Sequence, residues 1–215
     1  MSGMSSMSEK HLSIGLAIAP DGLSVGCVVA ETWRAAPIRI VALERVSVAG
    51  GPRDVARWFN ARAGDIRAWG LHEPRLRERR HVLVETGHYT LGKPVFEALW
   101  YSDARRKWEP RLSAVELVGV DLAIPQRDGW RTKVSRREVV SVLRLAMEHG
   151  GFEFGSVNRG LAIELRGQLG KLKQWRERDN PDGAGGEFAI AQALAVWDAV
   201  RVQRRLEIEQ PRRRA

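Results

Sequence analysis

Three strand-like segments stand at the start of the sequence before any helical pattern appears. Residues 12–19 form a short apolar run, residues 23–31 (LSVGCVVAE) form a second run after the turn residues Asp21 and Gly22, and residues 38–48 form a third after Pro37. Links this short usually join strands that run in opposite directions. The sequence therefore predicts an opening antiparallel meander of three strands, which excludes a sheet wound entirely from parallel units.

The spacing of apolar residues changes after Pro52. Val55, Trp58, Phe59 and Ala63 lie three or four positions apart, which predicts a helix over residues 52–69. Further along we predict strands over residues 81–85 and 114–120, a helix around residues 95–100, and helices over residues 136–149, 158–169 and 187–204. The predicted fold class is α/β, with helices flanking a mixed sheet.

Arginine dominates the charged residues. The chain has 35 Lys and Arg against 26 Asp and Glu, a net charge of +9, and 29 of the 35 cations are arginines. Guanidinium groups bind phosphate oxygens in pairs, so this balance favours a polyanionic partner, nucleic acid first. A GC-rich coding bias would also enrich arginine, and composition alone leaves both explanations open.

Cysteine content and hydropathy limit the class of protein further. The single Cys27 excludes an intramolecular disulfide and a cysteine-based zinc cluster, and we expect it to be a small buried residue. No apolar run reaches the roughly 18 residues of a membrane span, and residues 1–10 lack the apolar core of a signal peptide. We therefore expect a cytoplasmic protein without a membrane partner. The expected domain covers residues 11–205, between a disordered leader (1–10) and a basic disordered tail (206–215).

A meander followed by alternating helices and strands is the plan of the ribonuclease H-like fold. Within that plan, the chain resembles the nuclease domain of bacteriophage terminase large subunits in the order of its short motifs. These are Gly15-Leu16-Ala17 on the first strand, residues 82–87 (VLVETG) ahead of a helix, residues 130–137 (WRTKVSRR) leading into a helix, residues 164–169 (ELRGQL), and an Ala-rich helix that begins at Glu187. The resemblance covers most of the chain, from residue 12 to residue 202.

The resemblance implies a nuclease whose acidic residues bind two divalent metal ions, Mg²⁺ or Mn²⁺, about 3.5–4 Å apart. Hard cations of this kind prefer carboxylate oxygens. Glu85 matches the acid that follows the middle strand and Glu187 matches an acid at the start of the last helix, so the resemblance assigns both as catalytic metal ligands. Ala17 replaces the acid of the first strand, which leaves Asp21 or Glu31 as a further candidate ligand.

Each candidate residue also has a purely structural interpretation. Glu85 can be a solvated acid at a strand end, Glu187 an acid that favours the positive end of a helix dipole, and Asp21 a turn residue. The basic clusters can be ordinary solvated side chains, but their density favours contact with phosphates. The candidate DNA-binding residues are Arg105, Arg106, Lys133, Arg136 and Arg137.

The resulting hypothesis is a DNA-binding protein with the fold of a metal-dependent endonuclease, linked to viral DNA packaging and weakened in catalysis by Ala17. Two alternatives stay open: a nuclease-dead DNA-binding or assembly module, and an enzyme similar to Holliday-junction resolvases. The expected partners are DNA and other phage packaging proteins. The sequence contains no G-x-x-x-x-G-K-[ST] motif, so the ATPase motor of a full terminase has no counterpart in it.

Overall fold

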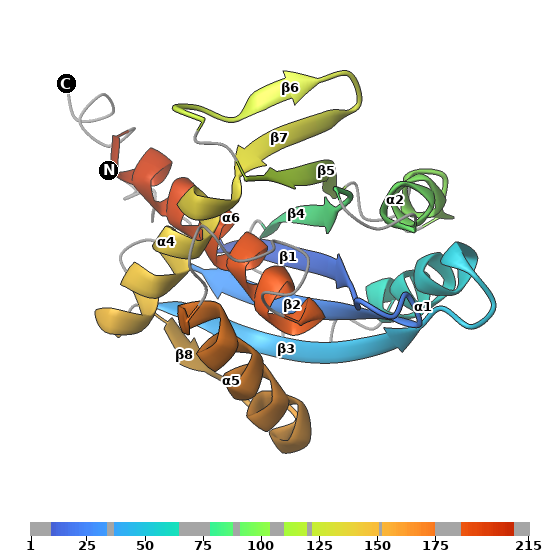
Figure 1. Ribbon diagram of the computed structural model, residues 1–215, viewed down its shortest axis with the longest axis horizontal. Coiled ribbons are helices and arrows are strands. Elements are labelled where there is room, and N and C mark those ends of the chain that lie inside the picture. Colours follow the sequence, from blue (N-terminus) through green and yellow to red (C-terminus); the bar gives the residue numbers. More distant parts are fainter. Residues whose placement is uncertain are drawn as a thin grey trace, which may run out of the picture.

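One mixed sheet of eight strands forms the centre of the molecule (Figure 1). The computed structural model describes residues 10–33, 37–64, 78–87, 91–103, 110–119, 122–150, 152–174 and 186–208. The strands are β1 (Lys10–Ile18), β2 (Ser24–Thr32), β3 (Ile38–Ser47), β4 (Glu78–Glu85), β5 (Arg111–Val118), β6 (Gln126–Asp128), β7 (Arg131–Ser135) and β8 (Phe152–Phe154). The described helices are α1 (Pro52–Gly64), α2 (Gly92–Trp100), α4 (Arg136–Glu148), α5 (Arg159–Gln174) and α6 (Glu187–Ile208).

The strands lie in the order β6-β7-β5-β4-β1-β2-β3-β8. β1 runs antiparallel to β2, and β2 runs antiparallel to β3, which confirms the predicted meander. On its other side β1 is parallel to β4, which is followed by the parallel strands β5 and β7. The carboxyl ends of these four parallel strands therefore meet at one edge of the sheet, and Glu85 is the last residue of β4.

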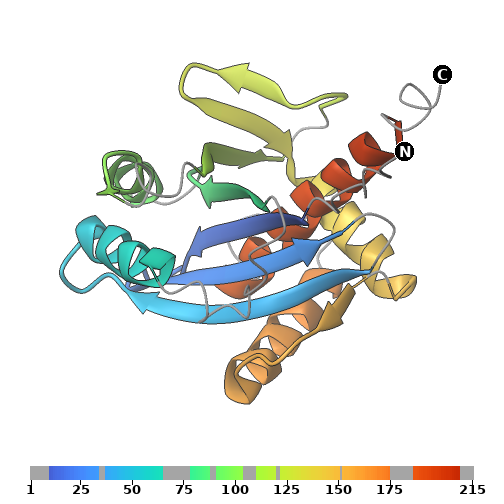
Figure 2. The same cartoon turned by 180° about the vertical axis from the view of Figure 1, so that it is seen from behind.

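Helices cover both faces of the sheet. α6 lies along one face with α4 and α5 beside it, and α1 and α2 lie against the other face (Figures 1 and 2). In β1, Leu12, Ile14 and Leu16 pack with α1 and α2, whereas Ala17 packs with α6. Because alternate residues of a strand face opposite sides, a strand that is buried on both faces is mostly apolar, and Lys10, His11 and Ser13 are the buried polar residues of β1.

α6 packs very close to β1. A Cβ atom built at Gly15 would lie 1.9 Å from the carbonyl oxygen of Ala191, and neither backbone can move aside. The alanines that α6 places against the sheet are small and fully buried. This close contact brings Glu187, the first residue of α6, down onto the strands.

Three short strands were not predicted. Residues 130–135 were expected to lead directly into a helix, but residues 131–135 form β7, and the helix begins at Arg136. β6 and β8 have three residues each, too few to show a periodic pattern. The last helix extends to Ile208, past the predicted domain boundary at residue 205. The expectations for residues 1–9, 65–69 and 209–215 lie outside the described residues.

The structure places the single cysteine and gives the length and apolar character of the described helices. Cys27 is buried with 1% of its surface exposed, as predicted, and burial raises the pKa of its thiol. None of the described helices combines the length and the apolar character needed to cross a membrane.

Candidate active site

Glu85 and Ala17 stand side by side at the carboxyl ends of two parallel strands. Leu16 of β1 is paired with Val84 of β4, and Ala17 and Glu85 are the next residues along. On the other side of β1, Ala17 is paired with Gly26 of β2. Ala17 packs on the α6 side of the sheet. Glu85 faces the same side, because neighbouring residues of a ladder point in one direction.

Glu187 lies over Gly26 at the start of α6. A Cβ atom built at Gly26 would come within 2.7 Å of Glu187 Cγ. On one side Ala17 is paired with Gly26, which Glu187 covers, and on the other side it is level with Glu85. The two glutamates therefore flank the alanine. The structure thus brings together, from β1, β4 and α6, the three positions to which the resemblance assigns metal binding.

Arg45 of β3 binds the carboxylate of Glu187. Its Nη2 donates a hydrogen bond to Glu187 Oε1 at 2.6 Å, and its Nε donates to the same oxygen at 3.2 Å. Arg45 also donates to Glu164 of α5. The bonds to Glu164 and Glu187 raise the pKa of Arg45, although partial burial opposes them. A permanent positive charge, shared with Glu164, therefore already lies against the Glu187 carboxylate.

Gln168 of α5 holds the start of α6 in place. Its Oε1 accepts hydrogen bonds from the backbone N–H groups of Phe188 at 2.9 Å and Ala189 at 3.1 Å. These groups belong to the first helical turn, where no intrahelical acceptor exists. The Nε2 of Gln168 donates to Glu187 Oε2 at 3.4 Å. Each carboxylate oxygen of Glu187 thus has a donor from the protein.

Glu85 is enclosed by the turn that follows β4. It is 4% exposed, and its Oε1 accepts a hydrogen bond from the backbone N–H of Gly87 at 2.7 Å. A Cβ atom at Gly87 would lie only 3.0 Å from that oxygen. The absence of a side chain at Gly87 lets the backbone approach the carboxylate and donate to it.

This set of donors does not fit a two-metal centre. Two ions need several carboxylate oxygens at once, whereas Ala17 contributes none and Glu187 is paired with Arg45. Within the described ranges, no group of three or more His, Cys, Asp or Glu side chains could hold a metal ion.

The other candidate ligands lie apart from this position. Asp21 is exposed in the turn between β1 and β2, where its Oδ1 accepts a hydrogen bond from the backbone N–H of Leu23 at 2.9 Å. Glu31 is paired in register with Leu12, near the opposite end of β1, and binds Lys10 Nζ at 3.1 Å. Asp21 thus closes a turn, and Glu31 neutralises a buried lysine.

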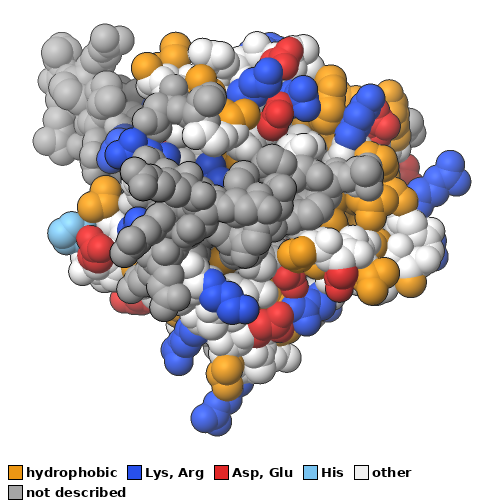
Figure 3. All heavy atoms as spheres, viewed as in Figure 1, with side chains coloured by type: hydrophobic (Ala, Val, Ile, Leu, Met, Phe, Trp, Pro, Cys, Tyr) orange, Lys and Arg blue, Asp and Glu red, His pale blue; other side chains and the backbone are white. Residues whose placement is uncertain are grey.

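The basic candidates that can be placed lie around the end of β7 and the start of α4, at the same sheet edge as Glu85. Lys133 Nζ binds Asp128 Oδ2 at 2.8 Å. Arg136 is buried with 5% exposure, whereas Arg137 is exposed. Arg137 is therefore the best placed of the three to meet a phosphate from solvent. Arg105 and Arg106 lie outside the described residues. Figure 3 shows Lys and Arg side chains spread around the periphery of the α6 face rather than gathered in one patch.

A second polar cluster is buried beneath α6 towards the start of β1. Asp198 Oδ2 accepts a hydrogen bond from Ser13 Oγ at 2.7 Å and lies 3.2 Å from His11 Nε2. His81 Nδ1 lies 2.8 Å from Asp198 Oδ1, and His81 Nε2 lies 2.8 Å from Ser113 Oγ. Burial raises the pKa of Asp198, but the hydrogen bonds from the two histidines outweigh it and hold the pKa well below its ordinary value.

Sequence reasoning missed Arg45, Glu164 and Gln168, and it gave the histidines no role. Glu164 and Gln168 lie four positions apart in the ELRGQL motif, which places both on one side of α5. That spacing is a signal that could have predicted a shared contact. Arg45 carries no local signal, because its partner is 142 positions away.

Solved structures share this arrangement of strands and helices. An Mn-soaked structure of the human cytomegalovirus terminase nuclease domain matches with a TM-score of 0.53 at 12% sequence identity, over 94% of this chain and 88% of that one. A second structure of the domain gives a TM-score of 0.52 at 12% identity, over 91% and 86%. The fold is similar to that of the terminase nuclease domain. The predicted ribonuclease H-like class is therefore confirmed.

Other comparisons add little. A structure of T. thermophilus RuvC in complex with Holliday junction substrate covers 89% of this chain and 94% of its own, at 14% identity. Its TM-score of 0.43 is too low to support an argument. No protein-family model matches the sequence, and no curated protein matches it. At 12% identity the terminase nuclease domain establishes the fold alone, so function has to be argued from the residues of this chain.

Proposed function

We propose that this chain binds DNA at the sheet edge where β1, β4, β5 and β7 end, and that metal-dependent cleavage is weakened or lost. The pairing of Arg45 with Glu187 beside Ala17 carries the proposal. In a two-metal nuclease, the metal ions balance the clustered carboxylates and stabilise the attacking and leaving oxygens. A guanidinium balances Glu187 here, and it offers no open coordination position for water or for a phosphate oxygen.

Binding at this edge is supported by the topology and by charge. In open α/β sheets, ligands bind outside the carboxyl ends of the strands. The exposed Arg137 lies at that edge, and a net charge of +9 attracts a polyanion from any direction. With the basic groups spread over the surface, we expect DNA binding that depends on the phosphate backbone more than on sequence.

We further propose viral DNA packaging as the setting, with other packaging proteins as partners. Two observations support this setting. The structural neighbours are nuclease domains of a viral terminase, and the sequence motifs resemble those of terminase nucleases. One observation favours the alternative of an active Mg²⁺- or Mn²⁺-dependent endonuclease. Both Glu85 and Glu187 are present, and they flank Ala17 as a metal-binding pair would.

Two measurements on the purified full chain test this proposal. The first is fluorescence anisotropy with a labelled blunt duplex over a series of KCl concentrations. The second is plasmid nicking in Mn²⁺ and in EDTA, with Glu85→Gln as the matched control. We expect binding that weakens steeply with salt, and nicking in Mn²⁺ no faster than that of Glu85→Gln.

Two results would overturn the proposal in different ways. Fast Mn²⁺-dependent cleavage that Glu85→Gln abolishes would establish an active nuclease and refute weakened catalysis. Absence of binding to both duplex and single-stranded DNA at low salt would refute the DNA-binding function.

A further inference from the structure

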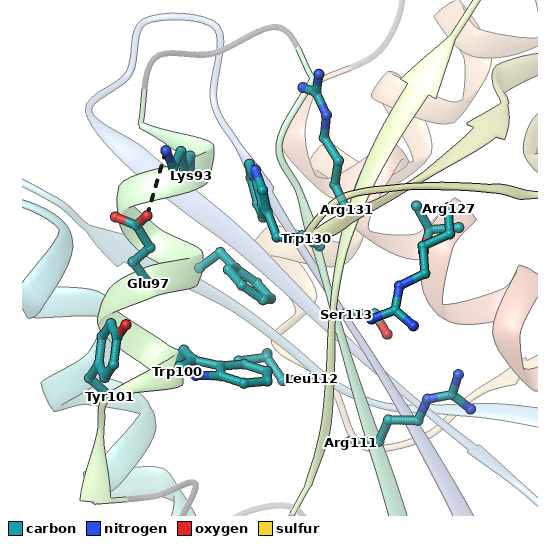
Figure 4. Close-up of a pocket in the computed structure, with 13 residues that line it drawn as sticks. Lys93, Glu97, Trp100, Tyr101, Arg111, Leu112, Ser113, Arg127, Trp130 and Arg131 are labelled. Atoms are coloured by element: carbon teal, nitrogen blue, oxygen red, sulfur yellow. Dashed lines mark ion pairs between the residues drawn. The ribbon is translucent and has the colours of Figure 1, made fainter.

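A cavity of about 670 Å³ lies between α2 and the strands β5 and β7 (Figure 4). It opens at the point where β5 is no longer paired with β7. The pairing of these strands begins at Ala114 and Arg131, so residues 111–113 leave the edge of β5 open towards the cavity. Ala114 packs in the same core cluster as α2. The other face is represented by Ser113, whose Oγ lies 2.8 Å from His81 Nε2 beneath α6. The cavity therefore spans this open edge of the sheet, and neither Glu85 nor Glu187 lines it.

Aromatic rings form one side of the cavity. The ring of Phe96 lies 5.7 Å from that of Trp100 and 5.4 Å from that of Trp130, measured between centroids. Trp130 is 42% exposed and Tyr101 is 79% exposed. Water therefore contacts ring surface that a planar ligand could cover, and stacking on such rings is a common way to hold a nucleic-acid base.

Positive charge predominates among the charged residues of the lining. These are the cations Lys93, Arg111, Arg127 and Arg131 and one acid, Glu97. Lys93 lies 3.7 Å from Glu97, and Arg131 is paired with acids outside the cavity. Neither Arg111 nor Arg127, both exposed, has an ion-pair partner within the part of the chain that the structure describes. These two guanidinium groups are available to an anion.

We propose that this cavity binds a segment of single-stranded DNA, with one unstacked base against Trp130 and its phosphates on Arg111 and Arg127. This inference rests on the DNA-binding function proposed above. In Figure 4 the aromatic rings of α2 and Trp130 lie on one side of the strand ribbon, and the side chains of Arg111 and Arg127 lie on the other. That division matches a nucleotide, which has a planar apolar base joined to an anionic phosphate.

The cavity favours a single strand over a duplex for a geometric reason. Bases in a duplex are stacked on each other and present only their edges, so they cannot lie flat on Trp130 without being unpaired first. A single strand exposes its base faces at little cost. Arg131 and Lys93, whose charged groups lie 6.0 Å and 5.7 Å from the centre of the Trp130 ring, add positive charge beside the base position.

The charge component is tested with two charge-matched double variants. Arg111→Gln/Arg127→Gln removes two positive charges from the cavity, and Arg53→Gln/Arg204→Gln removes two from exposed positions on α1 and α6. Binding of a labelled oligo-dT is measured by anisotropy over a series of salt concentrations. If both cavity arginines bind phosphates, their loss lowers the log–log salt slope by about 1.4, or about 0.7 for each phosphate of a single strand. The control pair leaves the slope nearly unchanged.

The stacking component is tested with Trp130→Leu. Loss of one base–aromatic contact weakens oligo-dT binding by about 5- to 150-fold, while binding to a blunt duplex stays unchanged. Oligo-dT should also quench tryptophan fluorescence in the wild type, and part of that quenching should disappear in the variant. Because Trp130 contacts Phe96, thermal melting checks the fold. If the variant melts early, Tyr101→Ala provides the test at a residue that is 79% exposed.

The outcomes separate this inference from the function on which it rests. Single-strand binding that falls in the cavity variants and not in the control pair supports the cavity site. Wild-type binding to the duplex, combined with cavity variants that bind oligo-dT like the control pair, overturns the cavity site alone. Failure of the wild type to bind either form of DNA overturns both proposals.

Discussion

Arg45 Nη2 lies 2.6 Å from Glu187 Oε1, beside the strand position that holds Ala17. The glutamate side chain is 6% exposed and the arginine side chain is 38% exposed, so the acid is buried and its partner reaches it from the rim. Removing the partner of a buried charge is costly, whereas partial exposure to water reduces that cost. The pair therefore stabilises the start of α6 and competes with any metal ion for this carboxylate.

We predict that Arg45→Gln lowers the free energy of unfolding by about 1–3 kcal/mol, because Glu187 would remain buried without its cation. Urea unfolding at neutral pH measures the change. The matched control is Arg57→Gln, which removes a 76%-exposed partner of Asp54 on α1 and should cost less than about 0.5 kcal/mol. Equal, small losses in the two variants would show that the Arg45 pair contributes no more than a surface ion pair.

We predict that Ala17→Asp lowers the melting temperature in EDTA and that Mn²⁺ restores it. Ala17 is 2% exposed between Glu85 and Glu187, so a new carboxylate there would be buried between like charges. A divalent ion relieves that repulsion and stabilises the state that binds it. Differential scanning fluorimetry with and without Mn²⁺ measures the effect, and plasmid nicking in Mn²⁺ should increase in the same variant.

Ala42→Asp provides the control for that experiment. Ala42 is a buried alanine of β3 that packs on the opposite face of the sheet, away from both glutamates. Its substitution should lower the melting temperature without recovery in Mn²⁺. If Mn²⁺ fails to stabilise Ala17→Asp as well, the Arg45–Glu187 pair has closed the site to metal even when a third carboxylate is supplied.

We predict that Arg137→Ala reduces the log–log salt slope of duplex DNA binding by about 0.9, the contribution of one phosphate contact on B-form DNA. The reason is its exposed position at the start of α4, at the edge where β4, β5 and β7 end. Arg136→Ala should behave differently, because Arg136 is buried and its loss should lower stability instead. Anisotropy titrations and thermal melts of both variants separate the two effects. An unchanged slope in Arg137→Ala would remove this residue from the DNA interface.

The sequence predicted best the elements that are defined by their own residues. The runs that became β1 and β2 are mostly apolar because both faces of the sheet are covered there, whereas β3 alternates between buried and more exposed residues over part of its length. The short turn at Asp21 allows only an antiparallel return. β7 could not be predicted in this way. Its residues are arginine, threonine, lysine, valine and serine, and they form a strand because β5 and β6 pair with them from outside the segment.

The candidate site was predictable only in part, for the same reason. Glu85 and Glu187 could be placed by their positions at the end of a strand and the start of a helix. Arg45, which changes what Glu187 can do, belongs to a strand pattern that says nothing about α6. The exposure of the Trp130 ring could not be predicted either, because the sequence does not distinguish a tryptophan in a cavity wall from one in a core.

The carboxylate of Asp198 connects α6 to β1 and β4, which are distant from it in sequence. It binds His11 across 187 positions and His81 across 117 positions, and Ser13 donates a further hydrogen bond. The histidine hydrogen bonds hold the pKa of Asp198 below the ordinary value of about 4 despite burial. A carboxylate with a lowered folded-state pKa stabilises the protein at every pH above its unfolded pKa, and this contribution is lost as the pH falls towards the folded pKa.

Asp198→Asn should therefore lower the free energy of unfolding at neutral pH by about 3–5 kcal/mol, the cost of breaking a buried charged network. The difference in the free energy of unfolding between the wild type and the variant should stay constant down to about pH 4. Below that pH it should become smaller, because only the wild type has this carboxylate to protonate. Urea unfolding from neutral pH down to about pH 3 measures both stabilities. Asp54→Asn removes a carboxylate of α1 that lies outside this cluster, and it serves as the control for the loss of one acidic side chain. A difference in unfolding free energy that is small at neutral pH, or that does not narrow in acid, would contradict this prediction. It would mean that Asp198 fills space beneath α6 without contributing its charge.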